Sequence, residues 1–247
     1  MADSLPQTAP RGPQILPEGI DGMVIRFAPA MDLAANRAAR AFRARIEAEG
    51  WPGVEETSVA LVSVLVRFDP RALPHAALQA RLSAALADHG ATAPAGVRGW
   101  VIPCAFGGDH GPDLAEAAAL AGVSEDQAVA DLCRPVEVLA IGFAPGQPYL
   151  GELPPHWALP RRQTLNPMVP EGALVTAVRQ MVLFANPSPT GWRQVGLTGF
   201  RCFRPDQADP FALAPGDRVR FQPVTAARLA DLCAADPLGG GAALEAP

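Results

Sequence analysis

The stretch GFAPGQPYLGELPPHW, residues 142–157, joins two parts of the chain that differ in pattern. Its three glycines and four prolines stand among Phe143, Tyr149 and Trp157, and Tyr149 is the only tyrosine in the sequence. Glycine permits backbone turns that other residues resist, while proline fixes φ and removes a hydrogen-bond donor. We therefore expect a stiff loop whose aromatic side chains either cap a hydrophobic core or form one wall of a binding site or partner interface.

The residues on either side of this loop predict a β-barrel. Before it, VEVLAIGFA (136–144) has the pattern of a buried strand, and two helices are expected at about 112–121 and 124–132. Ser124 followed by Gln127 forms a capping-box pattern at the start of the second helix. After Pro160, short strands are separated by glycine and proline, which is typical of a barrel. The expected strands cover residues 173–178, 181–184, 194–198, 201–203 and 218–221.

The N-terminal third predicts a small α+β domain of ferredoxin-like type. A strand at 23–27 precedes a helix that begins after Asp32 and ends at Gly50. The run TSVALVSVLVRF (57–68) alternates with the period of a strand, and is either one long strand or the end of a hairpin that begins near Val54. A second helix begins at Pro74. The first helix is expected to bury one stripe and to direct Arg37 and Arg40 elsewhere; the stripe is Ala35, Ala39, Phe42 and Ile46.

These elements predict an α+β protein with two folded domains. Residues 21–92 form the small α+β domain, and residues 97–224 form the barrel. GATAPAG (90–96) has the composition of a linker. Residues 1–20 are expected to be disordered, and residues 225–247 to form a short helix and a flexible tail.

Composition excludes several classes of function. The net charge of −5 gives no support for nucleic-acid binding, and no apolar run reaches the length of a membrane span. With no signal-peptide pattern at residues 1–14, we expect a soluble, cytoplasmic protein. The spacing of the four cysteines and four histidines does not predict a metal site. All 20 basic residues are arginine, so the chain has no lysine for a Walker-A loop, a Schiff base or a biotin carrier.

The second half of the chain resembles a known family. Its motifs are IPCAFGGDHGPDL (102–114), IGFAPGQPYLGELP (141–154), LPRRQT (159–164), VPEGALV (169–175), GWRQVGLT (191–198) and LAPGDRVRFQPV (213–224). Their order and separation resemble the family of the 5-oxoprolinase B subunit, also called the Kip-type inhibitor or allophanate hydrolase subunit 1 family. The resemblance covers about residues 22–224.

The resemblance implies a cyclophilin-like β-barrel behind the small α+β domain, and it implies partners. Such proteins work with a second cyclophilin-like subunit, similar to allophanate hydrolase subunit 2 or to the C subunit of 5-oxoprolinase. In the oxoprolinase case a subunit of the lactam-utilisation family joins them, and the complex uses ATP to open a cyclic amide. The resemblance equally implies an allophanate hydrolase-like or urea-carboxylase-like complex. This chain would bind no cofactor by itself and would contribute part of the amide-binding site.

Candidate site residues follow from the matched motifs. Arg161 and Thr164 match a motif that commonly reads P-R-x-x-T-P-R, and the fork of an arginine suits a planar carboxylate or carboxamide. Gln180 is retained in a third motif, and an amide can both donate to and accept from an amide ligand. Phe143 and Tyr149 complete the predicted substrate-binding set. The residues expected in the loop or at a partner contact are Gly146, Gln147, Pro148 and Trp192, with Trp192 more often a core residue in such a position.

Several positions depart from the family pattern. Gln147 stands where the family usually has an aromatic residue, Glu152 replaces a glycine, and Leu165 and Asn166 replace a proline and a second arginine. These changes indicate a divergent member with an altered substrate or an assembly role. The alternative function is that of a regulatory protein that binds and inhibits a histidine kinase. Prolyl isomerisation by the barrel has no support from the residues.

Overall fold

The computed structural model describes residues 12–88 and 98–245, and the chain divides into two compact units, Met1–Ala95 and Gly96–Pro247. Each unit has its own hydrophobic core. The linker expected at 90–96 lies outside the described residues. No helix in the described ranges is both long enough and apolar enough to cross a bilayer.

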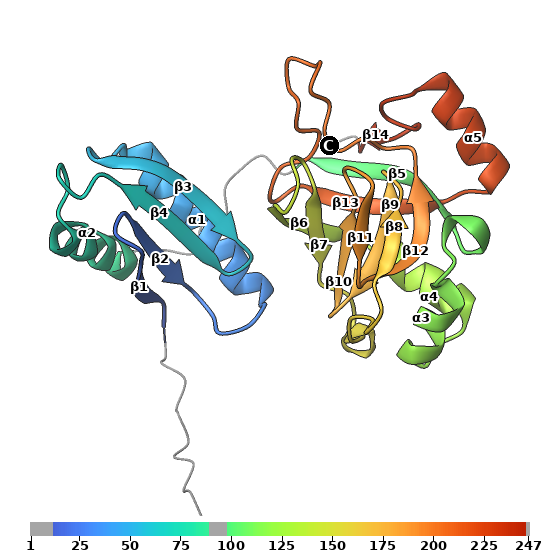
Figure 1. Cartoon of the computed structure of the whole chain (residues 1–247), viewed down its shortest axis with the longest axis horizontal. Coiled ribbons are helices and arrows are strands. Elements are labelled where there is room, and N and C mark those ends of the chain that lie inside the picture. The colour runs from blue at the N-terminus through green and yellow to red at the C-terminus, as the bar shows by residue number, and fades with distance from the viewer. Residues whose placement is uncertain (1–11, 89–97, 246–247) are drawn as a thin grey trace, which may run out of the picture. The chain divides into compact units, whose positions relative to one another are not determined.

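The first unit is one antiparallel sheet covered on one face by two helices (Figure 1). The strand order is β1-β2-β4-β3, and the apolar side chains of β2 and β4 pack with those of the helices. The elements are β1 (Gln14–Glu18), β2 (Gly22–Arg26), α1 (Leu33–Glu49), β3 (Val54–Ala60), β4 (Ser63–Phe68) and α2 (His75–Ala87).

Strand β1 corrects the expected disorder of residues 1–20. Every residue from Gln14 to Glu18 pairs with β2, and Ile15 packs against the core of the unit. The strands β2, β3 and β4 with the two helices give the ferredoxin-like order that the sequence predicts. The additional strand β1 precedes this predicted order in the chain and occupies the edge of the sheet beside β2. Residues 1–11 lie outside the described part of the chain.

The run at 57–68 is a hairpin, so the second of its two interpretations is correct. Its turn contains Leu61 at φ 51°, and the carbonyl of Leu61 accepts a hydrogen bond from the fully buried Asn36 at 2.5 Å. Arg40 donates to the side-chain oxygen of Asn36 at 3.1 Å and is only 8% exposed. The expectation that Arg40 points away from the packed face is therefore wrong, because it takes part in the polar contacts that hold the turn.

Helix α1 begins and ends at the predicted residues. The carboxylate of Asp32 accepts from the backbone N–H of Ala35 at 2.7 Å, and Gly50 is left-handed with its N–H bonded to the carbonyl of Ile46. We expect Asp32→Ala to lower the free energy of unfolding by about 1 kcal/mol, because an N–H at the helix start loses its acceptor. Urea denaturation measures the change, with Asp32→Asn as the control that keeps an acceptor. Equal losses in both variants would contradict the capping role.

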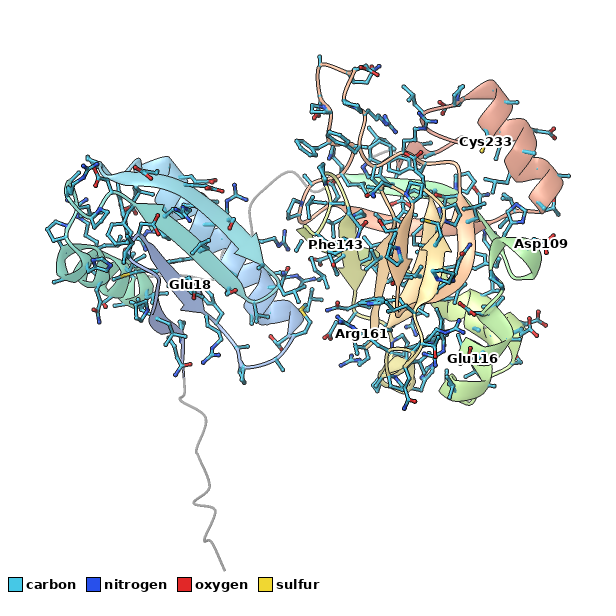
Figure 2. The ribbon with its side chains drawn as sticks, in the orientation of Figure 1. Glu18, Asp109, Glu116, Phe143, Arg161 and Cys233 are labelled. Atoms are coloured by element: carbon cyan, nitrogen blue, oxygen red, sulfur yellow. The ribbon has the colours of Figure 1, made fainter. Side chains whose placement is uncertain are left out.

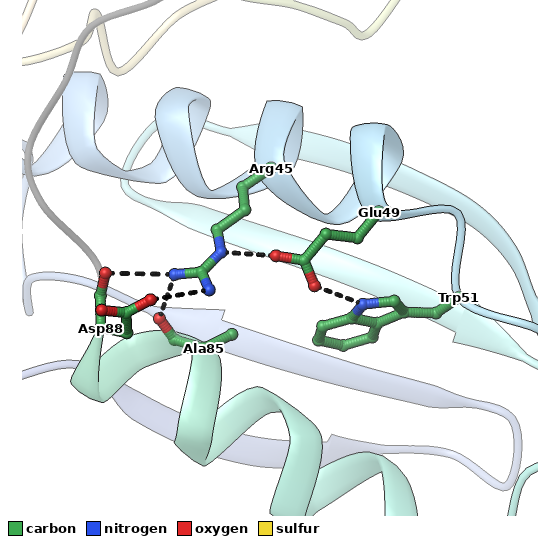
Figure 3. Close-up of polar contacts among 5 residues, drawn as sticks. All are labelled: Arg45, Glu49, Trp51, Ala85 and Asp88. Carbon is green, nitrogen blue, oxygen red and sulfur yellow. Dashed lines mark hydrogen bonds and ion pairs between the residues drawn. The ribbon is translucent and has the colours of Figure 1, made fainter.

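A polar cluster joins the C-terminal ends of the two helices (Figure 3). Arg45 donates to the carboxylate of Glu49, to the carboxylate and carbonyl of Asp88, and to the carbonyl of Ala85. Glu49 also accepts from the indole N–H of Trp51 at 2.7 Å. A guanidinium beside the last carbonyls of a helix interacts favourably with the helix dipole. The cluster therefore fixes the spacing of α1 and α2 and is a structural feature.

The second unit is a closed barrel of seven strands (Figure 1). Around the ring the order is β5-β12-β9-β10-β7-β6-β13, and β13 returns to β5 through the single parallel pairing of the described ring. The strands are β5 (Gly99–Phe106), β6 (Val136–Ile141), β7 (Pro148–Gly151), β9 (Ala173–Ala177), β10 (Gln180–Leu183), β12 (Arg193–Thr198) and β13 (Arg218–Pro223).

Additional elements surround the ring. The helices are α3 (Leu114–Ala121), α4 (Glu125–Leu132) and α5 (Ala226–Ala235), and the further strands are β8 (Asn166–Val169), β11 (Ser188–Thr190) and β14 (Ala243–Leu244). Ser124 caps α4 by accepting from the N–H of Gln127, but the Gln127 side chain donates to Asp131 and does not return to the cap.

Two expectations for the second unit are wrong. Residues 201–203 do not form a strand, because Phe203 makes only an isolated bridge to Phe211. The expected flexible tail is ordered as far as residue 245: Asp236 accepts from the N–H groups of Gly239 and Gly241, and β14 pairs with β5. Residues 246–247 lie outside the described part.

Apolar side chains lie on both faces of β9 and β10. Leu174, Met181 and Leu183 point into the barrel core, while Val175 and Val182 belong to a second cluster on the outer face. The β8–β11 ribbon supplies part of that outer cluster. The candidate site lies at this outer face of the barrel wall.

Candidate functional site

The loop at 142–157 has a defined backbone that exposes one aromatic ring. The carbonyl of Gln147 accepts from the N–H of Gly142, and the N–H of Gln147 donates to the carbonyl of Ala144, both at 3.1 Å. Phe143 has φ 67° and a side chain that is 79% exposed. A positive φ in a non-glycine residue is uncommon and is found preferentially at functional sites. Phe143 therefore does not cap the barrel core.

Glycine is required at one position of this loop. Gly146 has φ 72°, and a Cβ atom there would lie 2.9 Å from the carbonyl oxygen of Cys202. The loop backbone consequently lies directly against the segment around Cys202. Pro148, which opens β7, is also buried. Gly146 and Pro148 thus hold the loop in place and do not line the cleft.

The end of the loop is anchored to α4 by a buried carboxylate. Asp131 accepts from Trp157 Nε1 at 3.0 Å and from Gln127 Nε2 at 3.0 Å, and His156 Nε2 lies 2.7 Å from it. Burial opposes ionisation of Asp131, but the bonds from Trp157, His156 and Gln127 outweigh it and lower the pKa of Asp131. Asp131 is therefore an ionised anchor for the loop.

A cleft of about 280 Å³ lies between this loop and the β8–β11 ribbon. Of the predicted residues, Phe143, Gln147, Tyr149, Arg161 and Trp192 line it. The lining residues that sequence reasoning missed are Arg162, Leu165, Val182, Phe184, Pro189, Thr190 and Gly191. Side chains alternate along β10, so Val182 lies on the same face of the strand as Gln180. This alternation was the sequence signal that could have identified Val182.

Three side chains are stacked in series within the cleft. The guanidinium carbon of Arg161 lies 5.5 Å from the centre of the Trp192 ring, and Trp192 meets Tyr149 edge to face with the ring centres 6.3 Å apart. Trp192 is 7% exposed and packs in the outer apolar cluster. It therefore acts both as a core residue and as the platform beneath Arg161.

Arg161 differs from the neighbouring arginines because no carboxylate of the described residues pairs with it. Arg162 is bonded to Asp113 at 2.5 Å, and Arg193 is bonded to Glu116 and to the carbonyl of Pro160. Within the described part of the chain, the Arg161 guanidinium makes no hydrogen bond or ion pair and lies over the Trp192 ring. The backbone N–H of Arg162 donates to the carbonyl of Gly191 at 2.7 Å. This bond connects the segment that carries Arg161 and Arg162 to the end of the β8–β11 ribbon. The Arg161 guanidinium thus lies on the Trp192 ring with no carboxylate partner among the described residues. Figure 2 labels the Arg161 side chain on the second unit.

Two predicted residues do not line the cleft. Thr164 is exposed on the loop beyond Arg162. Gln180 is 5% exposed and lies opposite Gly151 on β7, two residues along from the pairing of Val182 with Tyr149. Side chains two residues apart on a strand share a face and are separated by roughly 7 Å. Gln180 is therefore next to the cleft, on the same face of the barrel wall.

Two buried cysteines, Cys104 and Cys202, and the partly buried Cys133 are unsuited to nucleophilic chemistry. Burial raises the pKa of Cys133 to about 11, and burial also raises the pKa values of Cys104 and Cys202. Because the thiolate is the reactive form, these thiols are inert at neutral pH. Among the described residues, no group of three His, Cys, Asp or Glu side chains could hold a metal ion. The cleft wall combines aromatic side chains with the guanidinium groups of Arg161 and Arg162.

Comparison with known proteins identifies the family. The model for the carboxyltransferase domain, subdomain C and D, matches residues 13–213, and the chain belongs to this family. It is similar to the 5-oxoprolinase B subunit of Bacillus subtilis (strain 168), with 31% identity over 220 residues that cover 84% of this chain and 91% of that protein.

A second relative agrees with this assignment, and a solved structure shares the fold. The chain is 42% identical over 124 residues to the 5-oxoprolinase B subunit of Escherichia coli O157:H7, a match to 49% of this chain and 56% of that protein. The urea amidolyase of K. lactis shares the fold with a TM-score of 0.77 at 19% identity, over 98% of this chain and 17% of that one. The predicted α+β architecture with a cyclophilin-like barrel is confirmed.

Proposed function

We propose that this chain is the B-type subunit of a cytoplasmic, ATP-dependent 5-oxoprolinase-like complex, and that its cleft binds a small amide that carries a carboxylate. The observation that carries the proposal is the free Arg161 guanidinium on Trp192 in an aromatic cleft. A guanidinium can bind a carboxylate with two parallel hydrogen bonds. Family membership and the relatives named as 5-oxoprolinase B subunits supply the reaction class.

The partner would be a protein similar to the C subunit of 5-oxoprolinase or to allophanate hydrolase subunit 2, with a lactam-utilisation-type subunit as the third member. ATP would be used by the complex and bound by a partner. Support comes from apolar side chains in and beside the cleft, since those of Phe143, Leu165 and Met168 are 79%, 61% and 59% exposed. Exposed apolar side chains that gather around a cleft favour an interaction surface.

The test is capture of the tagged chain from its native cells, followed by an assay of the captured complex for ATP-dependent hydrolysis of 5-oxoproline. We expect a stoichiometric partner that resembles the 5-oxoprolinase C subunit, and turnover that requires ATP. Co-purification of a histidine kinase without such activity would overturn the proposal in favour of the regulatory function, because the same apolar side chains could contact a kinase.

Gln180 provides a second measurement on the assembled complex. We expect Gln180→Ala to lower kcat/KM about tenfold, because an amide beside the cleft contributes on the order of one hydrogen bond to an amide ligand. The matched control is Gln207→Ala, in an exposed loop of the same unit. A Gln180→Ala complex with the turnover of the parent would remove Gln180 from the site.

A further inference from the structure

Gln147 is a buried amide in the wall of the cleft. Its backbone is fixed by the two hydrogen bonds of the loop turn, and its side chain is 1% exposed. The side-chain oxygen Oε1 is fully buried and has no hydrogen-bond partner among the described residues. Gln147 also lines the same cleft as Arg161 and Trp192.

A buried acceptor without a partner is unfavourable for the folded chain. Nearly all buried polar side-chain atoms in proteins are hydrogen-bonded, and each exception calls for a ligand, a water molecule or a strained site to explain it. An apolar side chain of similar volume would fill this position without that cost. The neighbouring lining residues Tyr149 and Trp192 already provide an apolar wall. Packing therefore does not account for an amide at this position.

We propose that Gln147 is a specificity-determining residue, whose Oε1 accepts a hydrogen bond from an N–H group of the bound ligand while Arg161 binds its carboxylate. The ligand class is a small carboxylic acid with a secondary amide. The matching ester and the N-alkylated amide lack the N–H donor, so the site discriminates against them. This inference rests on the proposed function for the presence of an amide ligand. Beyond that function, the inference identifies Gln147 Oε1 as the atom that selects the N–H group of the ligand.

Discrimination follows from the unsatisfied acceptor. A site built to hydrogen-bond a polar group rejects an analogue that lacks the group, because the buried partner is then left unpaired. An ester in place of the amide brings a lone pair toward Oε1 where the amide brings a donor. We expect the amide to bind about tenfold to a hundredfold more tightly than the ester, as one unmade buried hydrogen bond predicts.

The experiment is a calorimetric titration of the full chain, and of the captured complex, with two ligands. One is 5-oxoproline, and the other is the lactone in which oxygen replaces the ring N–H. The variants are Gln147→Met, which keeps the length of the side chain without its acceptor, and Gln163→Met in the exposed loop nearby as the control. Parent and Gln163→Met should prefer the lactam, and Gln147→Met should bind both ligands equally.

Thermal unfolding of Gln147→Met provides an independent measurement. Since the variant removes an unsatisfied buried acceptor, its Tm should equal or exceed that of the parent, and a lower Tm would show that Oε1 is satisfied in the free protein. Equal affinity of the parent for lactam and lactone, or a preference that survives in Gln147→Met, would overturn the role of Gln147. Binding of neither ligand to chain or complex would overturn it too. The proposed function fails separately, when the complex lacks ATP-dependent turnover.

Discussion

Replacement of Arg161 by alanine should lower kcat/KM of the assembled complex by at least about a hundredfold. The guanidinium lies on Trp192 in the cleft and has no carboxylate partner among the described residues, so its charge is available to a ligand. Hydrogen bonds to charged groups contribute about 1.5–3 kcal/mol each, and a loss of about 3 kcal/mol is a factor of about 100 or more. Steady-state kinetics of the reconstituted complex measures the effect.

Two variants separate a role in binding from a change in net charge. Arg228→Ala removes the same charge from an exposed position on α5 and should leave kcat/KM unchanged. Arg161→Lys keeps the charge without the planar fork, so its kcat/KM should lie between those of the parent and of Arg161→Ala. Because Arg161 is exposed, its loss should leave Tm and complex formation intact. Full activity in Arg161→Ala would exclude it from the amide site.

Replacement of Asp131 by alanine should have the largest effect on stability, at about 2–4 kcal/mol. The carboxylate is buried and accepts from Trp157, His156 and Gln127, and its loss leaves the buried indole N–H without an acceptor. Chemical denaturation of the isolated chain measures the loss. Asp126→Ala, at an exposed position of the same helix, should cost less than about 1 kcal/mol. Similar values for the two variants would show that Asp131 does not anchor the loop.

The same carboxylate makes stability depend on pH. Since the folded pKa of Asp131 is below its ordinary value of about 3.9, the contribution is present in full above that value. It is lost as pH falls through the folded pKa, because the unfolded chain takes up the proton first. The gap in unfolding free energy between parent and Asp131→Ala should therefore be smaller below about pH 4 than at neutral pH.

The fold was predictable where local signals and packing agree. Asp32 and Gly50 mark the ends of α1, and three residues of the predicted stripe, Ala39, Phe42 and Ile46, pack in the core with the sheet. Strand β1 was missed because residues 14–18 lie in a proline- and glycine-rich region and gain their structure by pairing with β2. The burial of Arg40 likewise depends on the distant Leu61 turn, through Asn36, which helical periodicity does not report.

The candidate site was predictable only in part, because local motifs identify some of its residues while distant packing brings them together. The motifs single out Arg161, Phe143 and Tyr149, and these residues line one cleft. Their meeting depends on the β8–β11 ribbon, which covers the outer face of β9 and β10 and brings Leu165 and Thr190 into the wall. Strand alternation alone could not place this ribbon, because β9 and β10 are buried on both faces.

Closure of the ring has a consequence for folding order. β5 is the first barrel strand in the chain, yet its neighbours in the ring are β12 and β13, which end at Thr198 and Pro223. During synthesis the barrel therefore cannot close until the chain up to Pro223 has left the ribosome. The first unit has all its strands and helices before Asp88, and domains fold as units in the order of synthesis. Contacts so distant in sequence are slow to form, so barrel closure should limit the rate at which this protein folds.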